Sequence, residues 1–343
     1  MNIKKLNTIL VAKELKSLYC IANGIIEYED DSIIYIGFSN YLILLTLEMT
    51  DYIDKIYNLK IPYELKCKLK SCRARIKEYN SDAKKLLSDI EKLNNESLEY
   101  YSKNLSVLQK IFFNKLITNL GIYKYNNEII SNTFLFDKDL KPIIYKNRER
   151  SKEQIMKSGE VIGTLLNTLR ELLYHQELPS IKISFDYLFV AEDYNVTKKN
   201  KLLSSNCDTS IALFLLNTLS IINYCVEIID TFNICDELKY RIFYITFYRT
   251  YHNMNTIVND KHEYPQIKKI LNKYKTLDNR TFRNSMFHYD ITDKLKPNEV
   301  NIDEMYYGII SKYLKMNDTT FKNNLKNYLV DASDEISKII LNK

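Results

Sequence analysis

Apolar residues recur three and four positions apart over most of the chain, which is the spacing of amphipathic α-helices. In the first half of the sequence this pattern predicts helices over residues 4–22, 32–57, 63–94, 98–120 and 151–176. Gly and Pro are scarce, with 6 and 5 residues in a chain of 343. Because a turn-rich β-fold needs more of both, the composition agrees with a mainly α-helical protein.

Two short segments in the middle of the chain have the signals of β-strands. Thr133–Phe136 and Pro142–Tyr145 flank the turn-like sequence Asp137-Lys138-Asp139, which predicts a small hairpin. Apolar and polar residues alternate over 181–187, which predicts a further strand. We therefore expect a small β insertion in an otherwise helical chain.

A polar segment over residues 195–206 separates this region from a second set of predicted helices. The shift in composition predicts a domain boundary near residue 200, between a helical domain over 1–200 and a helical bundle over 201–343. In the bundle the apolar spacing predicts helices over residues 207–232, 235–259, 265–274, 279–289, 303–315 and 319–341.

The apolar share of 45% and the charged share of 27% are typical of a folded soluble protein. The most apolar stretch, over 211–229, contains Asn223 and Glu227, which favours a buried core helix over a membrane span. Near the N-terminus the charged residues Lys13 and Glu14 interrupt the apolar run. No targeting segment is therefore predicted, and the cytoplasm is the expected location, with no membrane partner.

The six cysteines lack the paired spacing of zinc sites, and most lie in apolar stretches where a thiol acts as a small hydrophobic group. The sequence contains no glycine-rich phosphate loop, no His-Glu-x-x-His motif and no Gly-x-Ser-x-Gly motif. We therefore expect neither a metal nor a cofactor, and the low glycine count argues against Rossmann and P-loop nucleotide-binding folds.

The predicted helix over 279–289 carries the clearest chemical pattern, because Arg283 and Asn284 precede His288 by five and four residues. An imidazole titrates near neutral pH, so His288 could take up or give a proton. An arginine stays charged and presents a planar fork to phosphate oxygens, which suits Arg283. These two groups suffice for the cleavage of RNA by transesterification without a metal ion.

The pattern Arg-Asn-x-x-x-His, on a short helix near the end of a helical bundle, resembles the motif of the HEPN superfamily over roughly residues 207–341. The resemblance implies a metal-independent endoribonuclease with Arg283, His288 and Asn284 at its catalytic centre. Because HEPN domains occur in toxins and abortive-infection proteins, it also implies a toxin or antiphage effector. An antitoxin or a defence-system component would then be a partner in addition to RNA.

The same residues allow a purely structural interpretation. His288 would then be hydrogen-bonded inside the bundle, and Arg283 would pair with a carboxylate such as Asp278 or Asp290. The protein would in that case be a non-catalytic helical scaffold that binds RNA or other proteins. The two interpretations differ in whether Arg283 and His288 face solvent.

Further residues around the motif are candidates for contact with substrate. Arg280 and Tyr289 flank the motif, and His252 lies in a polar, aromatic part of a preceding helix, where a surface or capping role is the alternative. The resemblance to HEPN proteins also implies a polar residue on an early helix that orients Arg283, and Glu227, at the end of a very apolar helix, is the candidate, with simple exposure as the alternative.

The segment over residues 66–77 holds six basic residues and no acidic residue. Lys70, Arg73 and Lys77 of this segment are candidates for phosphate contacts along an RNA strand, with a solvated helix as the alternative. The net charge of +6 is compatible with such a polyanionic partner.

On an ideal helix Arg283 and His288 point about 140° apart, so a single helix aims them poorly at one atom. Asn284 and His288, four residues apart, would share a face. We therefore expect a homodimer with a composite site around its two-fold axis, as HEPN proteins usually have. The alternative is a pairing within one chain, in which the N-terminal region acts as a degenerate second domain.

Overall fold

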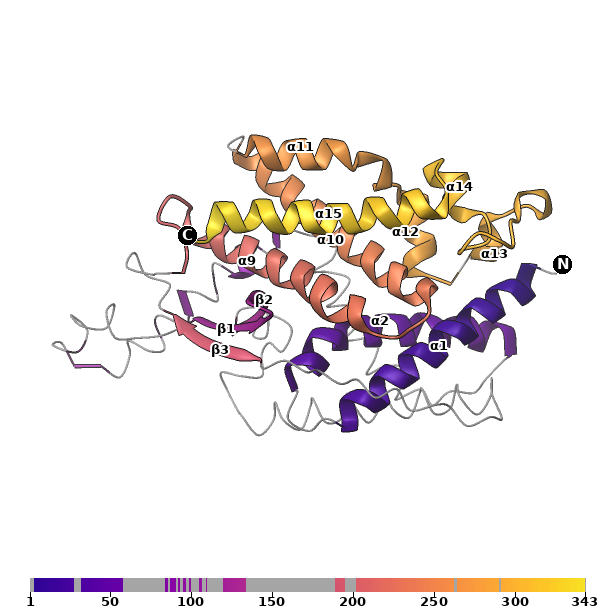
Figure 1. Cartoon of the computed structure of the whole chain (residues 1–343), viewed down its shortest axis with the longest axis horizontal. Helices are drawn as coiled ribbons and strands as arrows, with labels where there is room; N and C mark the ends of the chain where they lie inside the picture. The colour runs from indigo at the N-terminus through magenta and orange to yellow at the C-terminus, as the bar shows by residue number, and fades with distance from the viewer. Residues whose placement is uncertain are drawn as a thin grey trace.

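The computed structural model describes residues 3–27, 32–57, 120–133, 189–194, 202–261, 264–289 and 291–342, and scattered positions between 84 and 109. Helices account for 73% of the described residues, and the strands form one small antiparallel sheet in the middle of the chain (Figure 1). The predicted fold class, mainly α-helical with a small β insertion, is confirmed.

The first described helices are α1 (Ile3–Glu27) and α2 (Ser32–Tyr57), which pack on each other. The prediction for 32–57 is confirmed at both ends, whereas the helix predicted over 4–22 extends to Glu27. The helices predicted over 63–94, 98–120 and 151–176 lie wholly or mostly outside the described residues.

The C-terminal part is a bundle of helices, as its apolar spacing predicted. Its members are α9 (Thr209–Asn223), α10 (Asp236–Lys261), α11 (Pro265–Lys273), α12 (Arg280–Phe287), α13 (Ile291–Lys294), α14 (Ile309–Leu314) and α15 (Asp318–Ile340). The helix predicted over 303–315 begins only at Ile309, because Tyr307 and Gly308 have positive φ angles of 59° and 109°. A Cβ on Gly308 would lie 2.3 Å from the Glu299 carbonyl oxygen, so this turn requires glycine.

The most apolar helical segment, Thr209–Thr231, is long enough to span a membrane by length and composition, but 89% of its most apolar window is buried inside the protein. Asp208 caps its start by accepting hydrogen bonds from the N–H groups of Ser210 and Ile211. The segment ends in a π-helical turn over Tyr224–Ile228, followed by a 3-10 turn over Ile229–Thr231. This burial is that of a core helix.

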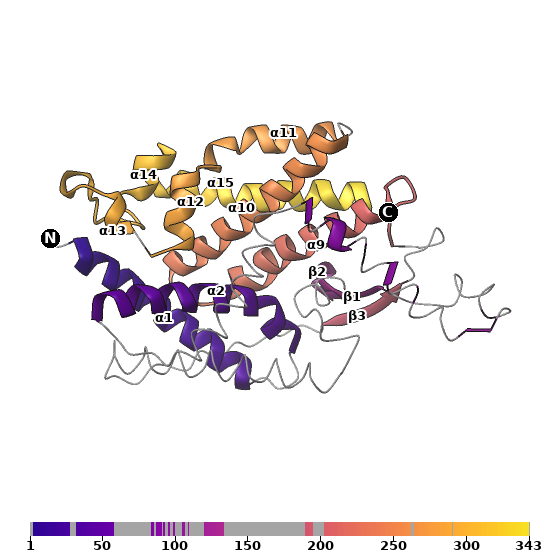
Figure 2. The ribbon, with the colours of Figure 1, turned by 180° about the vertical axis from the view of Figure 1, so that it is seen from behind.

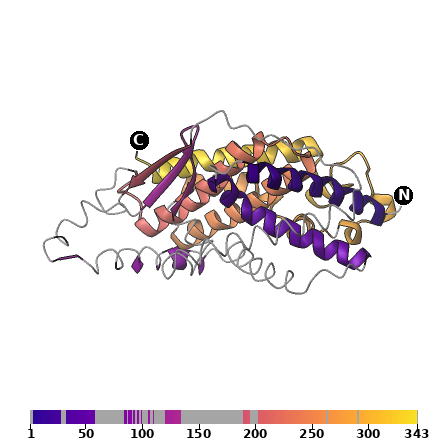
Figure 3. The same cartoon turned by 90° about the horizontal axis from the view of Figure 1, so that it is seen from below.

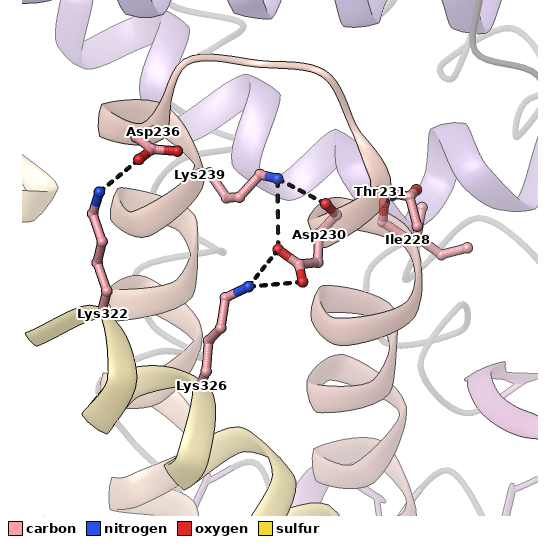
Figure 4. Close-up of polar contacts among 7 residues, drawn as sticks. All are labelled: Ile228, Asp230, Thr231, Asp236, Lys239, Lys322 and Lys326. Carbon is pink, nitrogen blue, oxygen red and sulfur yellow. Dashed lines mark hydrogen bonds and ion pairs between the residues drawn. The ribbon is translucent and has the colours of Figure 1, made fainter. Parts of the chain in front are cut away.

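Ion pairs fix the connection between α9 and α10 against α15 (Figure 4). The Lys326 Nζ atom lies 3.0 and 3.1 Å from the two carboxylate oxygens of Asp230. Lys239 donates to the Asp230 carbonyl oxygen at 2.7 Å, and Lys322 donates to Asp236 at 2.6 Å. The connection is thereby joined both to the start of α10 and to the terminal helix.

The sheet has the strand order β2-β1-β3, with both neighbouring pairs antiparallel. Its strands are β1 (Leu120–Tyr125), β2 (Glu128–Asn132) and β3 (Val190–Tyr194). Asn126 and Asn127 connect β1 and β2 with positive φ angles of 52° and 66°, the geometry of a two-residue hairpin turn. Apart from Thr133, the predicted hairpin and the strand over 181–187 lie outside the described residues.

Hydrophobic residues on both sides of the expected boundary near residue 200 belong to one buried cluster. Helices α1 and α2 lie along one side of the bundle, where α1 contacts α10 and α13 and α2 contacts α12 (Figures 1, 2 and 3). The Tyr41 hydroxyl of α2 is 2.7 Å from the Thr246 hydroxyl of α10, and both residues are buried. The boundary stays a prediction, but the helices on its two sides share a core.

Candidate functional site

Helix α12, which carries the motif, begins at Arg280 because Asn279 caps it. The Asn279 side chain accepts hydrogen bonds from the N–H groups of Thr281 and Phe282, each at 3.0 Å, and so satisfies donors that a helix start leaves open. Its Nδ2 donates to the Tyr313 carbonyl oxygen at 3.1 Å. The cap therefore fixes both the start of α12 and its position against α14.

One face of α12 is buried, and the opposite face carries motif side chains. Phe282 and Met286 are fully buried, and the Phe282 ring meets the Tyr244 ring of α10 edge to face at 4.7 Å between centroids. Arg283 and Asn284 lie on the partly exposed face. The four-residue spacing of the two apolar side chains thus turns Arg283 and Asn284 towards solvent.

The helix ends one residue before the motif histidine. His288 has an extended backbone, with φ −126° and ψ 147°, and its N–H donates to the Asn284 carbonyl oxygen at 2.9 Å. The helix predicted over 279–289 is therefore too long. The expected divergence of about 140° between Arg283 and His288 assumed a continuous helix, and α12 ends before His288. Tertiary contacts set the direction of His288 instead.

A buried carboxylate of α2 pairs with His288. Glu48 Oε2 lies 2.7 Å from His288 Nδ1; the Glu48 side chain is 6% exposed and the His288 side chain 36% exposed. A carboxylate on one ring nitrogen fixes the tautomer and orients the ring. The second nitrogen, Nε2, is then the one that can act on a bound group.

Sequence reasoning missed Glu48, because it lies 240 positions from His288 and shares no motif with it. One signal was present in the sequence. Glu48 is the charged residue in the otherwise uncharged and mostly apolar run Tyr41–Met49. A charged side chain on a buried helix face usually has a partner, so such a position is a candidate for an ion pair of structural or functional importance.

The Arg283 guanidinium stacks on aromatic rings, and among the described residues no carboxylate pairs with it. Its Cζ lies 4.6 Å from the centroid of the Phe287 ring and 5.2 Å from that of Tyr248. Nη1 donates to Oδ1 of Asn284 at 3.0 Å, and Nε has no hydrogen-bond partner in the described part of the chain. Nε is a buried atom, so it is not itself available to a ligand. Stacking fixes the plane of the guanidinium, and a planar guanidinium suits phosphate oxygens.

His252 of α10 lies close to the motif arginine, through Tyr248. The His252 and Tyr248 ring centroids are 4.4 Å apart, and Tyr248 also contacts Arg283. Nε2 of His252 is 3.2 Å from Oδ1 of Asp278, the carboxylate that was a candidate partner for Arg283. Burial raises the pKa of the Tyr248 hydroxyl, an effect that the positive charge of Arg283 opposes. Asp290, the other candidate partner, lies outside the described residues.

Other candidate residues are distributed more widely. Arg280 is exposed at the start of α12, next to this cluster, whereas Tyr289 is only 4% exposed and lies in the core, away from the surface expected for a substrate contact. Glu227 accepts a hydrogen bond from Asn126 of the hairpin at 3.3 Å, so its observed partner is not Arg283. The basic candidates Lys70, Arg73 and Lys77 lie outside the described residues.

Glu227 lines a pocket of about 420 Å³ between α9, β2 and α15, and this pocket contains no motif residue. Burial and the neighbouring charges of Glu227 and Asp334 raise the pKa of Glu128, which also lines it. In the part of the chain that the structure describes, no group of three or more His, Cys, Asp or Glu residues has the geometry of a metal site.

No family model, no curated protein and no solved structure matches the chain.

Proposed function

We propose that the protein is an endoribonuclease of the HEPN type, which cleaves RNA by transesterification without a metal ion. The observation that carries this proposal is the Glu48–His288 pair, whose imidazole is partly exposed beside a stacked arginine that lacks a carboxylate partner among the described residues. A partly exposed imidazole can exchange a proton with a bound group, and a stacked guanidinium can bind phosphate oxygens.

In this mechanism His288 takes the proton of the 2′-hydroxyl through Nε2. The 2′-oxygen forms a bond to phosphorus, the bond from phosphorus to the 5′-oxygen breaks, and the leaving oxygen takes a proton from water. The imidazolium ion of His288 then returns its proton to the hydroxide that remains. The products are a 2′,3′-cyclic phosphate and a 5′-hydroxyl. Glu48 holds the ring in place and stabilises the imidazolium ion that forms.

Arg283 binds the non-bridging phosphate oxygens, where negative charge accumulates during the reaction. Asn284 holds one edge of its guanidinium. Arg280 and His252 contact the flanking RNA, and Lys70, Arg73 and Lys77 follow its phosphates. The buried Tyr289 has no part in substrate binding in this proposal.

We further propose that the protein acts in the cytoplasm as a toxin or antiphage effector, as a homodimer, and under the control of an antitoxin or a defence-system partner. These proposals rest on the motif's resemblance to HEPN proteins.

The test is induction of the wild-type protein and of His288→Ala in cells, followed by measurement of growth and RNA integrity. We expect growth arrest and RNA fragmentation with the wild type and neither effect with the variant. Tyr328→Phe, which changes a buried residue of α15, serves as the folded control and should arrest growth like the wild type. RNA that stays intact under the wild-type protein would favour the scaffold alternative.

A further inference from the structure

A fully buried ion pair lies beneath the motif. Nε of Arg241 in α10 donates to both carboxylate oxygens of Glu14 in α1, at 2.8 and 3.0 Å, and both side chains are 0% exposed. Burial raises the pKa of Glu14, an effect that Arg241 opposes. A buried ion pair seldom adds stability over an apolar pair of the same size. A role in fixing local geometry therefore explains the Arg241–Glu14 pair better than a gain in stability does.

The arginine of this pair holds the end of the motif helix. Nη1 of Arg241 donates to the carbonyl oxygens of Ser285 and Met286, at 3.1 and 2.8 Å. These carbonyls belong to the last turn of α12, where no further N–H of the helix is available to them. The backbone immediately before His288 is therefore fixed from α10.

The carboxylate of the pair, together with α1, holds the residue that follows His288. The Tyr289 hydroxyl donates to Glu14 at 2.5 Å, and the Arg241 guanidinium lies 4.5 Å from the centre of the Tyr289 ring. Nδ2 of the fully buried Asn7 donates to the Tyr289 carbonyl oxygen at 2.7 Å. His288 is thus bracketed by fixed backbone on both sides.

We propose that Asn7, Glu14, Arg241 and Tyr289 form a motif clamp, which positions His288 so that its imidazole meets Glu48. Because the backbone is fixed before and after His288, only rotation about its side-chain bonds remains free. The hydrogen bond to the Glu48 carboxylate of α2 restricts this rotation. Helices α1 and α2 are therefore parts of the catalytic site. This inference rests on the proposed function for its catalytic consequence, but its geometric content can be tested separately.

Two substitutions of the same kind separate positioning from stability. Tyr289→Phe removes the hydroxyl that bonds to Glu14 and keeps the ring under Arg241. Tyr328→Phe is the matched control, because Tyr328 is also fully buried and its hydroxyl is 3.0 Å from the Thr250 hydroxyl of α10, in a contact that does not involve the motif. If the two variants lower the melting temperature equally, a difference between them in the His288 signals or in kcat is due to the clamp and not to stability.

A second pair of variants covers the case in which Tyr289→Phe does not fold. Asn7→Ala removes the hydrogen bond to the Tyr289 carbonyl oxygen. Lys13→Met, its control, removes another contact of α1, the ion pair of Lys13 with Glu237 of α10, which lies partly at the surface and does not touch the motif.

The first readout is the ¹⁵N signals of the 4 histidines in the labelled full chain. We expect the His288 signals to shift or broaden in Tyr289→Phe and Asn7→Ala, and to stay unchanged in both controls. The second readout is cleavage of an RNA oligonucleotide, for which we expect kcat to fall about 10- to 100-fold in the clamp variants with KM nearly unchanged, because misplacement of a catalytic group acts on the transition state.

His288 signals that are the same in the clamp variants and their controls overturn the motif clamp, whatever the activity. If the wild-type protein cleaves no RNA, the proposed function is overturned. The motif clamp is then tested by the His288 signals of the clamp variants and their controls alone. A loss of kcat that is equal in Tyr289→Phe and Tyr328→Phe also counts against the clamp, because it would reflect stability alone.

Discussion

At the scale of single residues, the pair of Glu48 and His288 is the centre of the account. The motif residues are candidates from the sequence, because Arg, Asn and His at this spacing suit phosphate chemistry, and their role stays a prediction. Their partners could not, because Glu48 and Asp278 reach their histidines through the tertiary fold. The extended conformation of His288 was equally hidden, since local propensity continues the helix past it.

Glu48→Gln tests the role of the carboxylate at this scale. The substitution keeps the size of the side chain and removes the charge that stabilises the imidazolium ion. We expect kcat to fall by about 10-fold or more, but by less than the 10²–10⁴-fold expected for His288→Ala. Single-turnover cleavage of an RNA oligonucleotide measures the loss. A Glu48→Gln protein with wild-type kcat would show that the pair has no catalytic role.

At the scale of elements, caps and turns set where the helices around the candidate site begin and end. Periodicity located α10, α11, α12 and α15 to within a few residues. It failed where backbone geometry dominates, as at Tyr307 and Gly308, whose positive φ angles delay α14. The hairpin turn at Asn126 and Asn127 was not predicted either, although Asn is favoured in such turns.

Asn279→Ala tests whether the cap of α12 matters for the site. The variant loses the cap and the hydrogen bond to Tyr313, so we expect a stability loss of about 1 kcal/mol and a fall in cleavage. Asn317→Ala is the matched control, because Asn317 caps α15 by accepting a hydrogen bond from the Thr320 N–H at 2.8 Å. Urea unfolding and cleavage assays on both proteins provide the comparison. A control that loses as much activity as Asn279→Ala would contradict a specific role for the α12 cap.

At the scale of the whole molecule, the N-terminal helices and the C-terminal bundle build the site together. Composition placed a boundary near residue 200, because the polar segment there is visible in the sequence. Glu14, Tyr41 and Glu48 make buried contacts with α10 and the motif. The sequence does not show these contacts, because the sequence of a helix does not reveal which distant residue its buried polar side chains pair with. Site and core are therefore shared across that boundary.

Mixing Arg283→Ala with His288→Ala protomers tests the proposed homodimer. In a dimer of one Arg283→Ala and one His288→Ala protomer, a composite site can combine the intact Arg283 of one protomer with the intact His288 of the other. We therefore expect partial recovery of cleavage, up to about one quarter to one half of the wild-type rate after random exchange of protomers. An active protein that sediments as a monomer at all working concentrations would exclude the homodimer.

Metal-independent cleavage at His288 is tested most directly by mass spectrometry of the RNA ends that the purified wild-type protein produces in EDTA, with His288→Ala measured alongside. We expect 2′,3′-cyclic phosphate and 5′-hydroxyl ends from the wild type, and a yield about 10²–10⁴-fold lower from the variant in the same time. Equal yields from the two proteins, 5′-phosphate ends, or a complete loss of wild-type cleavage in EDTA would contradict this expectation.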